Sequence, residues 1–213
     1  MVPPQHNSNK GGHPPSGRRP PARERLLDAA AECFYNHGVN GTGIDMITSA
    51  AGVAKMTLYN NFASKDDVVL AYLQRRHGEW LELYRRRLAS GAGRDGVRAV
   101  LDAYVEHAEK PYAGGFRGCG LLNAAAELPA GAPGRSLVRQ HKEQVEALLA
   151  GHLAEIPGLP ADQVALLAEE LSFLLEGAMA RSGLDGTTVR LYRARELATK
   201  IVDGATTTTR SRR

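Results

Sequence analysis

The stretch from Gly41 to Asp66 constrains the fold of this chain more than any other part of the sequence. Its first half places Ile44, Ile47 and Ala51 on one face of a helix about two turns long. Gly52 follows, and glycine tolerates the left-handed backbone that a tight corner between two helices requires. The stretch therefore predicts a short helix that ends in a sharp turn.

A second short helix is expected directly after this turn, with Leu58 and Phe62 on its buried side, four residues apart. The first helix has a capping-box-like start, in which the Thr42 hydroxyl accepts from the first amides and Asp45 follows three residues later. The exposed face of the second helix carries Lys55, Met56, Thr57, Tyr59, Asn60 and Asn61. Two short helices around a glycine corner indicate a helix-turn-helix at about residues 44–63, whose second helix lies in the major groove of DNA.

The run VAKMTLYNNFASKDDVV resembles the recognition helix and the following helix of the TetR family of transcriptional regulators. The family pattern G-V-x-x-x-x-L-Y-x-x-F-x-x-K-[ED] is matched here by Gly52, Val53, Leu58, Tyr59, Phe62, Lys65 and Asp66. The sequence departs from family usage at Gly43, usually Ser or Thr, and at Thr48, usually Ala. The resemblance implies an all-α protein of about nine helices, with an N-terminal three-helix reader and a C-terminal helical domain for ligand binding and dimerisation.

Four parts are expected along the chain. Residues 1–20 are rich in Pro, Gly, Asn, Ser and His and predict a disordered basic tail, either solvated or touching DNA. Residues 21–66 form the DNA-binding domain, and residues 67–203 form the effector-binding and dimerisation domain. Residues 204–213 are expected to be a second disordered tail.

A long helix at about residues 65–88 should join the two domains, with Ser64 and Asp67 capping its start. The last two helices, expected at about residues 161–182 and 188–202, repeat apolar residues three and four apart. Such a pattern is compatible with ordinary core packing. The resemblance implies instead that these helices pair with their copies, and a two-fold operator requires a homodimer with two readers.

The charge of the chain is concentrated in its tails. Six of the 27 basic residues lie in residues 1–20 and 204–213, which leaves 21 basic and 23 acidic residues between. This balance favours a localised DNA-reading face over a generally basic surface. Two cysteines do not make a disulfide framework, and no apolar run reaches the roughly 20 residues that span a bilayer. We therefore expect a cytoplasmic, nucleoid-associated protein without a membrane partner and without a secretion signal.

A mostly apolar effector cavity is expected in the second domain. Asn123 and Glu127 share one helix face, and inward-facing polar groups need partners that a ligand can supply. The predicted apolar lining is Tyr104, Phe116, Leu122, Phe173 and Met179, and the predicted polar residues are Cys119, Asn123, Glu127, His141 and Glu176. The alternative is that these polar groups pair with arginine or backbone at the domain surface.

Other chemistry in the second domain has weaker support. A metal set of Glu127, His141 and Glu176 lacks the ligand spacing of known sites, so no metal or cofactor is predicted. Cys119 with His141 lacks an oxyanion donor and a third orienting group, so the chain is not expected to be an enzyme. Redox sensing by Cys119 stays open.

The predicted DNA contacts divide into two roles. Lys55 and Lys65 should bind phosphates, while Thr57 and Asn60 should read base edges. Thr42, Met56 and Tyr59 complete the predicted DNA-binding set. The function that follows is a ligand-responsive regulator, a repressor by resemblance, that binds its operator as a homodimer and is released by a small-molecule effector. The alternative is a constitutive DNA-binding, chromosome-associated interaction protein without such a switch.

Overall fold

The computed structural model of this chain describes residues 20–88 and 91–210. These residues contain nine α-helices and no strand, which confirms the all-α prediction. The tail predicted at residues 1–20 lies outside the described residues except for Pro20. The helices are α1 (Ala22–His37), α2 (Ile44–Ala51), α3 (Lys55–Tyr59), α4 (Lys65–Leu88), α5 (Arg94–Ala108), α6 (Gly120–Glu127), α7 (Pro133–Ala154), α8 (Val164–Asp185) and α9 (Val189–Arg210).

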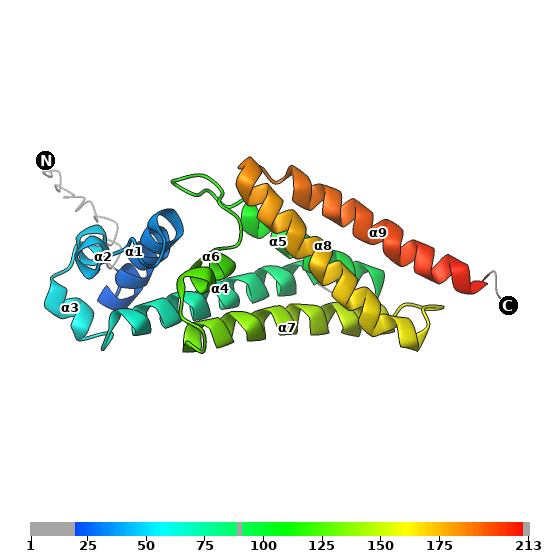
Figure 1. Cartoon of the computed structure of the whole chain (residues 1–213), viewed down its shortest axis with the longest axis horizontal. Helices are drawn as coiled ribbons and strands as arrows, with labels where there is room; N and C mark the ends of the chain where they lie inside the picture. Colours follow the sequence, from blue (N-terminus) through cyan, green and yellow to red (C-terminus); the bar gives the residue numbers. More distant parts are fainter. Residues whose placement is uncertain (1–19, 89–90, 211–213) are drawn as a thin grey trace, which may run out of the picture.

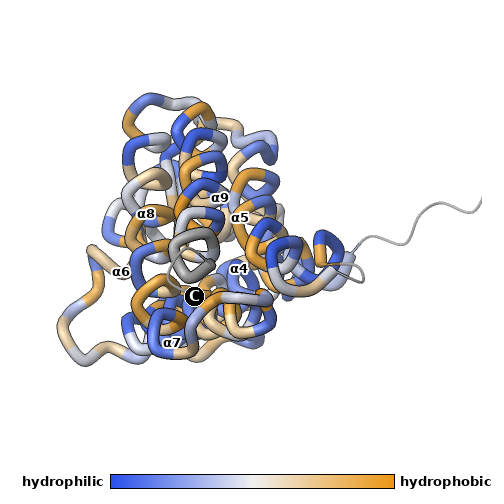
Figure 2. The backbone as a smooth tube through the Cα atoms, turned by 90° about the vertical axis from the view of Figure 1, so that its right-hand side faces the viewer, coloured by the Kyte–Doolittle hydropathy of each residue, from blue (hydrophilic) through white to orange (hydrophobic). Residues whose placement is uncertain are grey.

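The molecule is elongated, with α1, α2 and α3 at one end and α8 and α9 toward the other (Figure 1). Helix α4 leaves the three-helix end and runs into the larger helical part, where α7 lies alongside it. Seen along the molecule, α9 lies between α8 and α5 (Figure 2). In the described part of the chain, no helix is both long and apolar enough to cross a membrane.

The helix-turn-helix forms as its apolar spacing predicts. Leu26, Ile47 and Leu58, from the three short helices, have no exposed surface. Full burial of such a side chain stabilises the fold by roughly 1.5–3 kcal/mol. Gly52 has a left-handed backbone, with φ of 60°, and its N–H donates to the Ser49 carbonyl at 3.1 Å. Glycine is therefore required by the geometry of this corner.

The capping prediction for Thr42 is wrong, whereas that for Ser64 is confirmed. The chain turns back after α1, so the Thr42 hydroxyl donates to the Gly38 carbonyl at 2.7 Å, and Gly43 occupies the N-cap of α2 without a side-chain bond. At the start of α4, the Asp67 N–H donates to Ser64 Oγ at 3.1 Å, and Ser64 Oγ donates to Asp67 Oδ2 at 2.9 Å. The Ser64 hydroxyl therefore caps the first turn of α4 as expected, and the Asp67 carboxylate accepts from this hydroxyl.

Two apolar cores hold the chain together. One fills the larger part with residues of α4, α5, α7, α8 and α9, and in it Trp80 of α4 packs against Tyr104 of α5 and His141 of α7. The other joins α1, α2, α3 and the start of α4 to Leu121, Ala124 and Val138 of α6 and α7. Apolar packing therefore crosses residue 66, and the domain boundary placed there stays a prediction.

Helix boundaries differ most from expectation at the end of the chain. The prediction of a disordered tail from residue 204 is wrong through Arg210, where α9 ends. Threonine-rich sequence has low helix propensity, but Arg94 of α5 binds Asp203 at 3.0 Å and the Thr206 hydroxyl at 2.8 Å. These tertiary contacts hold the last turns of α9. Helix α7 begins three residues earlier than expected, at Pro133, because proline is favoured at the first helical position.

Candidate functional site

The candidate DNA-reading surface is the exposed side of α3, at one end of the molecule (Figure 1). Lys55, Met56, Tyr59 and Asn60 are exposed there, and Thr57 is half-buried. Met56 keeps 69% of its surface open to solvent although it is apolar. A helix with this exposure can enter a groove without rearranging its own packing, and contact of these residues with DNA stays a prediction.

The surroundings of Thr42 and Lys55 bear on their predicted contact with DNA. Thr42 is fully buried and bonded to Gly38, so its side chain does not face the surface. Lys55 forms an ion pair with Asp45 of α2 at 2.9 Å, and this hydrogen bond raises the pKa of Lys55. More than half of each side chain is exposed, so water screens the pair and it contributes little to stability. Lys55 can therefore exchange Asp45 for a phosphate at small cost.

Arginine side chains fix the position of α3 relative to α1 and α2. Arg25 of α1 donates to the Ala51 carbonyl at 2.9 Å and to the Gly52 carbonyl at 3.3 Å, at the C-terminal end of α2. Cations are favoured at this end of a helix, where carbonyl groups lack partners. Arg23 lies over the Phe62 ring, 5.0 Å from its centroid. The reader is thus a rigid platform for α3.

A cleft of about 480 Å³ separates this reader from the larger helical part. Its walls come from α1, from residues 117–119, from α6 and from the C-terminal half of α8. The lining residues are Phe34, Tyr35, Gly38, Arg117, Gly118, Cys119, Leu122, Asn123, Glu127, Met179, Ala180, Gly183 and Leu184. A volume of this size lies within the range of small-molecule sites.

Five predicted effector residues line this cleft: Cys119, Leu122, Asn123, Glu127 and Met179. Helix α8 approaches the segment before α6 so closely that a Cβ on Gly183 would lie 2.6 Å from the Gly118 nitrogen. Glycine at both positions lets the two backbones meet and form the floor of the cleft. The Asn123 amide donates to the Arg117 carbonyl at 3.0 Å, so this side chain also braces the cleft.

Hydrogen bonds tie the cleft to the C-terminal end of α1. The Arg117 guanidinium donates to the Tyr35 carbonyl at 2.9 Å and to the Asn36 carbonyl. The Arg117 N–H donates to Tyr35 Oη at 2.6 Å, and this hydroxyl donates to the Gly118 carbonyl at 3.2 Å. Burial raises the pKa of Tyr35 to about 12, so its hydroxyl keeps the proton that it donates. From the α6 wall of the cleft, Glu127 Oε2 accepts the Asn40 N–H at 2.7 Å.

Tyr104 and Glu176 lie in a separate cluster around Lys142, which is absent from the predicted set. Lys142 Nζ donates to Glu176 Oε1 at 2.6 Å and to the Tyr104 hydroxyl at 3.3 Å. It also lies 3.6 Å from the sulfur of Cys119, which links this cluster to the cleft wall. Neither Tyr104 nor Glu176 lines the cleft. The partner of these groups is therefore a partly buried lysine, whereas the alternative interpretation from the sequence expected arginine or backbone at the domain surface.

The remaining three predicted effector residues do not line the cleft either. His141 is buried beside Trp80, and its Nδ1 lies 2.9 Å from Nδ1 of His77. Burial, followed by the charges of Lys142 and His77, lowers the pKa of His141 to about 3. Phe116 packs half-buried against the larger core. Phe173 points away from the cleft and keeps 65% of its surface exposed on α8.

The contribution of α1 to the cleft has no local signal in the sequence. Phe34 and Tyr35 fit the buried stripe of a reader helix, and Arg117 lies 82 residues from the carbonyl of Tyr35 that it binds. Only the fold brings them together. The glycine-rich run before α6 is a usable hint, because glycines at positions such as Gly118, with φ of 83°, often mark close backbone approaches.

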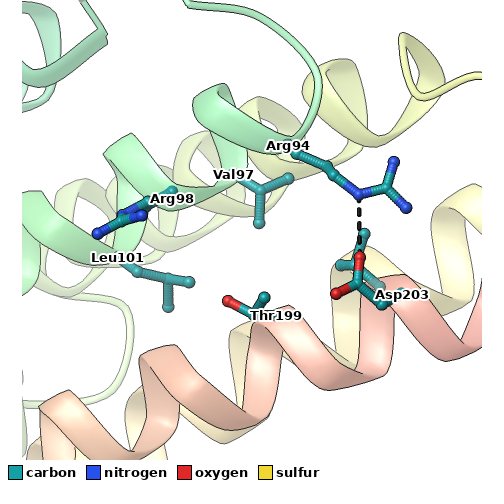
Figure 3. A pocket seen from close by; sticks show the side chains of 7 residues that line it. Arg94, Val97, Arg98, Leu101, Thr199 and Asp203 are labelled. Atoms are coloured by element: carbon teal, nitrogen blue, oxygen red, sulfur yellow. Dashed lines mark hydrogen bonds and ion pairs between the residues drawn. The ribbon is translucent and has the colours of Figure 1, made fainter.

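A smaller hollow lies between α5 and α9 (Figure 3). Its volume of about 40 Å³ leaves room for about one or two water molecules, and the ion pair of Arg94 with Asp203 spans it. This hollow is too small for an effector. Within the described ranges, no group of three or more His, Cys, Asp or Glu side chains could hold a metal ion.

Comparison with known proteins agrees with this geometry. Residues 26–72, which contain α2 and α3, match the family model described as bacterial regulatory proteins, tetR family. The HTH-type transcriptional activator FasR of Mycolicibacterium smegmatis is 37% identical over 103 residues, which cover 45% of this chain and 47% of that protein. The HTH-type transcriptional repressor KstR2 of Rhodococcus jostii is 35% identical over 105 residues, which cover 49% and 47%. The chain thus spans about half the length of these two relatives.

Similarity to solved structures covers the whole fold. The crystal structure of a TetR-family transcriptional regulator from Streptomyces coelicolor has a TM-score of 0.77 and 31% sequence identity. The matched part covers 87% of this chain and 96% of that chain, so both the reader and the larger helical part are shared. This chain therefore belongs to the TetR family of bacterial regulatory proteins, and it is a DNA-binding transcriptional regulator rather than an enzyme.

Proposed function

We propose that this regulator is a homodimeric repressor in the cytoplasm, and that a small-molecule effector bound in the cleft releases it from its operator. The observation that carries this proposal is the composition of the cleft wall: α1 of the reader forms one side, and α6 and α8 form the other. A molecule held there touches the DNA-binding part and the larger helical part at once. Its binding energy can therefore depend on how the two are arranged.

The cleft favours an amphipathic effector. Phe34, Leu122, Met179 and Leu184 offer an apolar surface, while polar groups converge from Asn123, Arg117 and Glu127. Neither Arg117 nor Glu127 has an ion-pair partner within the described residues, so both are available to charged or polar groups of a ligand. An apolar body with one polar end matches this arrangement, as in most small-molecule sites.

The exposed face of α8 and α9 supports the dimer. Large apolar side chains are exposed on both helices, among them Leu166 and Phe173 on α8 and Val189 and Leu197 on α9. A groove of about 350 Å³ runs between the two helices, beside Gly177 and Ala178. Phe173 and Leu197 line this groove together, and an exposed apolar groove of this kind marks an interaction site. A second copy of the same face is its natural partner, because two-fold pairing is self-complementary.

Dimerisation would supply the second reader that a two-fold operator needs. Two copies of α3 must be about 34–36 Å apart to enter successive major grooves on one side of DNA. Lys55 and Lys65 then fix the position on the phosphates, and Thr57 and Asn60 read bases. Of the two relatives above, one is named an activator and the other a repressor. Transcription in vitro from an operator-containing promoter distinguishes these signs, and we expect it to fall when the protein is added.

A substitution that fills the cleft tests the proposal while the effector is still unidentified. Ala180→Trp places an indole into the cleft from α8. Gly151→Trp is the matched control, because Gly151 is exposed on α7 and a Cβ there meets no atom within 4 Å. The operator is first selected from random duplex DNA with the wild-type protein. The dissociation constant is then measured for both variants at one salt concentration.

We expect Ala180→Trp to weaken operator binding about tenfold, which corresponds to about 1.4 kcal/mol, and Gly151→Trp to bind like the wild type. Unchanged binding by both variants would mean that the cleft does not control DNA binding. The constitutive DNA-binding interpretation would then stand. A thermal-shift screen identifies the natural effector class, because a ligand of the native state raises the melting temperature.

A further inference from the structure

The C-terminal end of α1 is held from outside the reader. It forms four hydrogen bonds with residues 117 and 118. The carbonyls of Tyr35 and Asn36 accept from the Arg117 guanidinium. The Tyr35 hydroxyl accepts from the Arg117 backbone N–H and donates to the Gly118 carbonyl. The last carbonyls of a helix have no partner inside the helix, and a cation satisfies them best. Arg117 therefore caps a reader helix from the opposite side of the cleft.

Glu127 holds the next part of the reader. Its carboxylate accepts the N–H of Asn40, in the turn that leads from α1 to α2. The contact is close: a Cβ on Gly38 would lie 2.5 Å from Glu127 Oε1. Only glycine leaves space for the carboxylate here, and the φ of 80° at Gly38 adds a second reason for this residue. Arg117 and Glu127 together form what we call the α1 clamp.

Both clamp residues also line the cleft. A ligand that approaches them meets a guanidinium and a carboxylate whose present partners are neutral backbone groups. Hydrogen bonds between charged groups are roughly twice as strong as neutral ones, so a polar ligand group can compete for either residue. Clamp and ligand site therefore share the same two side chains.

We propose that the α1 clamp couples the cleft to the DNA-reading surface, so that an effector acts by removing Arg117 and Glu127 from α1. This route leads directly from the cleft to α1 and does not pass through α4. It rests on the proposed function of the cleft. With the clamp closed, the end of α1 and the turn before α2 are fixed, and α3 is held through α2. With the clamp open, the reader can change its angle to the larger helical part.

The test uses two clamp variants and one matched control. Arg117→Met removes the guanidinium, and Glu127→Met removes the carboxylate that accepts the Asn40 N–H but keeps an unbranched side chain of similar length. Arg135→Met is the control, because Arg135 also donates to two helix-end carbonyls, those of Ala125 and Leu128, but does so within the larger helical part. Operator affinity, melting temperature and amide hydrogen exchange in α1 and α2 are measured for each protein.

We expect Arg117→Met and Glu127→Met to weaken operator binding roughly three- to tenfold, the usual size for residues that transmit coupling. Hydrogen exchange should accelerate at the end of α1 and in residues 38–43. Arg135→Met should bind the operator within about twofold of the wild type, although its melting temperature should fall about as much as those of the two clamp variants. If both clamp variants bind the operator like the wild type, or if all three variants lose affinity in proportion to stability, the inference is overturned.

A double-mutant cycle with the cleft-filling substitution separates this inference from the function on which it rests. If the clamp transmits the signal, Ala180→Trp weakens operator binding in the wild type but has little further effect in Arg117→Met. If it weakens both equally, the cleft controls DNA binding by another route, and only the clamp is refuted. If Ala180→Trp has no effect even in the wild type, the proposed function fails and the coupling inference fails with it.

Discussion

Replacing Lys142 by methionine should destabilise the protein by about 2–3 kcal/mol, because it leaves the Glu176 carboxylate without its cation. Lys142 Nζ and Glu176 Oε1 are 2.6 Å apart, and the two side chains are 18% and 25% exposed. Removing one partner of a fully buried pair costs about 3–5 kcal/mol, and an exposed pair contributes about 0–1 kcal/mol. The partial exposure of this pair places the expected cost between these limits.

The pH at which the effect is measured follows from the pKa of Lys142. Burial lowers this pKa, but Cys119, Tyr104 and Glu176 outweigh burial, so the net shift is upward from 10.5. A raised lysine pKa contributes stability that is complete below the unfolded value and is lost only as the pH rises through the folded value. At pH 7 the amino group of Lys142 is therefore fully protonated.

Urea unfolding at pH 7 measures the effect, and one protein concentration is kept throughout because the proposed dimer would make stability depend on concentration. The melting temperature should fall by roughly 5–10 °C in a chain of this size. Lys142→Met with Glu176→Leu should recover most of the loss, since the stranded charge is then gone. A loss below about 0.5 kcal/mol in Lys142→Met would show that water screens this pair and would refute the reasoning.

Three further predictions concern acid stability, assembly and DNA contact. The folded pKa of His141 is about 3, against 6.5 in the unfolded state, so the unfolded state binds the extra proton as the pH is lowered between these values. The free energy of unfolding should therefore fall by up to about 1.4 kcal/mol for each pH unit of acidification. A pH series of urea titrations should give a shallower fall for His141→Asn. Phe173→Glu should make the protein monomeric by light scattering, while Ala147→Glu on the exposed side of α7 should leave it dimeric. Lys55→Ala should reduce the slope of log affinity against log salt concentration by about 1. Asn60→Ala should instead reduce discrimination at one base pair only, by about 1–3 kcal/mol. Equal loss of specificity from both substitutions would refute the assigned roles.

Local chemistry makes the reader predictable from the sequence. Gly52, Leu58 and Phe62 act through neighbours within a few residues, so their spacing contains the information that the fold uses. The capping of α4 by Ser64 is local in the same sense. Thr42 shows the limit of such patterns, because a turn between α1 and α2 directs its hydroxyl backward to Gly38 rather than forward into α2.

The cleft is only half predictable, because its walls meet through tertiary structure. Residues of the α6 region, such as Asn123 and Glu127, share one helix, and its periodicity places them together. The opposite wall comes from α1, about 80 residues away along the chain, and no spacing rule connects the two. The same reason explains α9, whose last turns are held by Arg94 of α5 although their own residues favour other structure.

Sequencing of DNA selected from a random duplex library tests the central claim most directly. The library is bound to the wild-type protein at physiological salt, and the mass of the resulting complex gives the number of chains per duplex. A dimeric two-fold reader should select an inverted repeat whose half-sites are about one helical turn apart, with two chains on each duplex or a multiple of two. A single asymmetric site bound by one chain, or no enrichment of any sequence, would contradict the account.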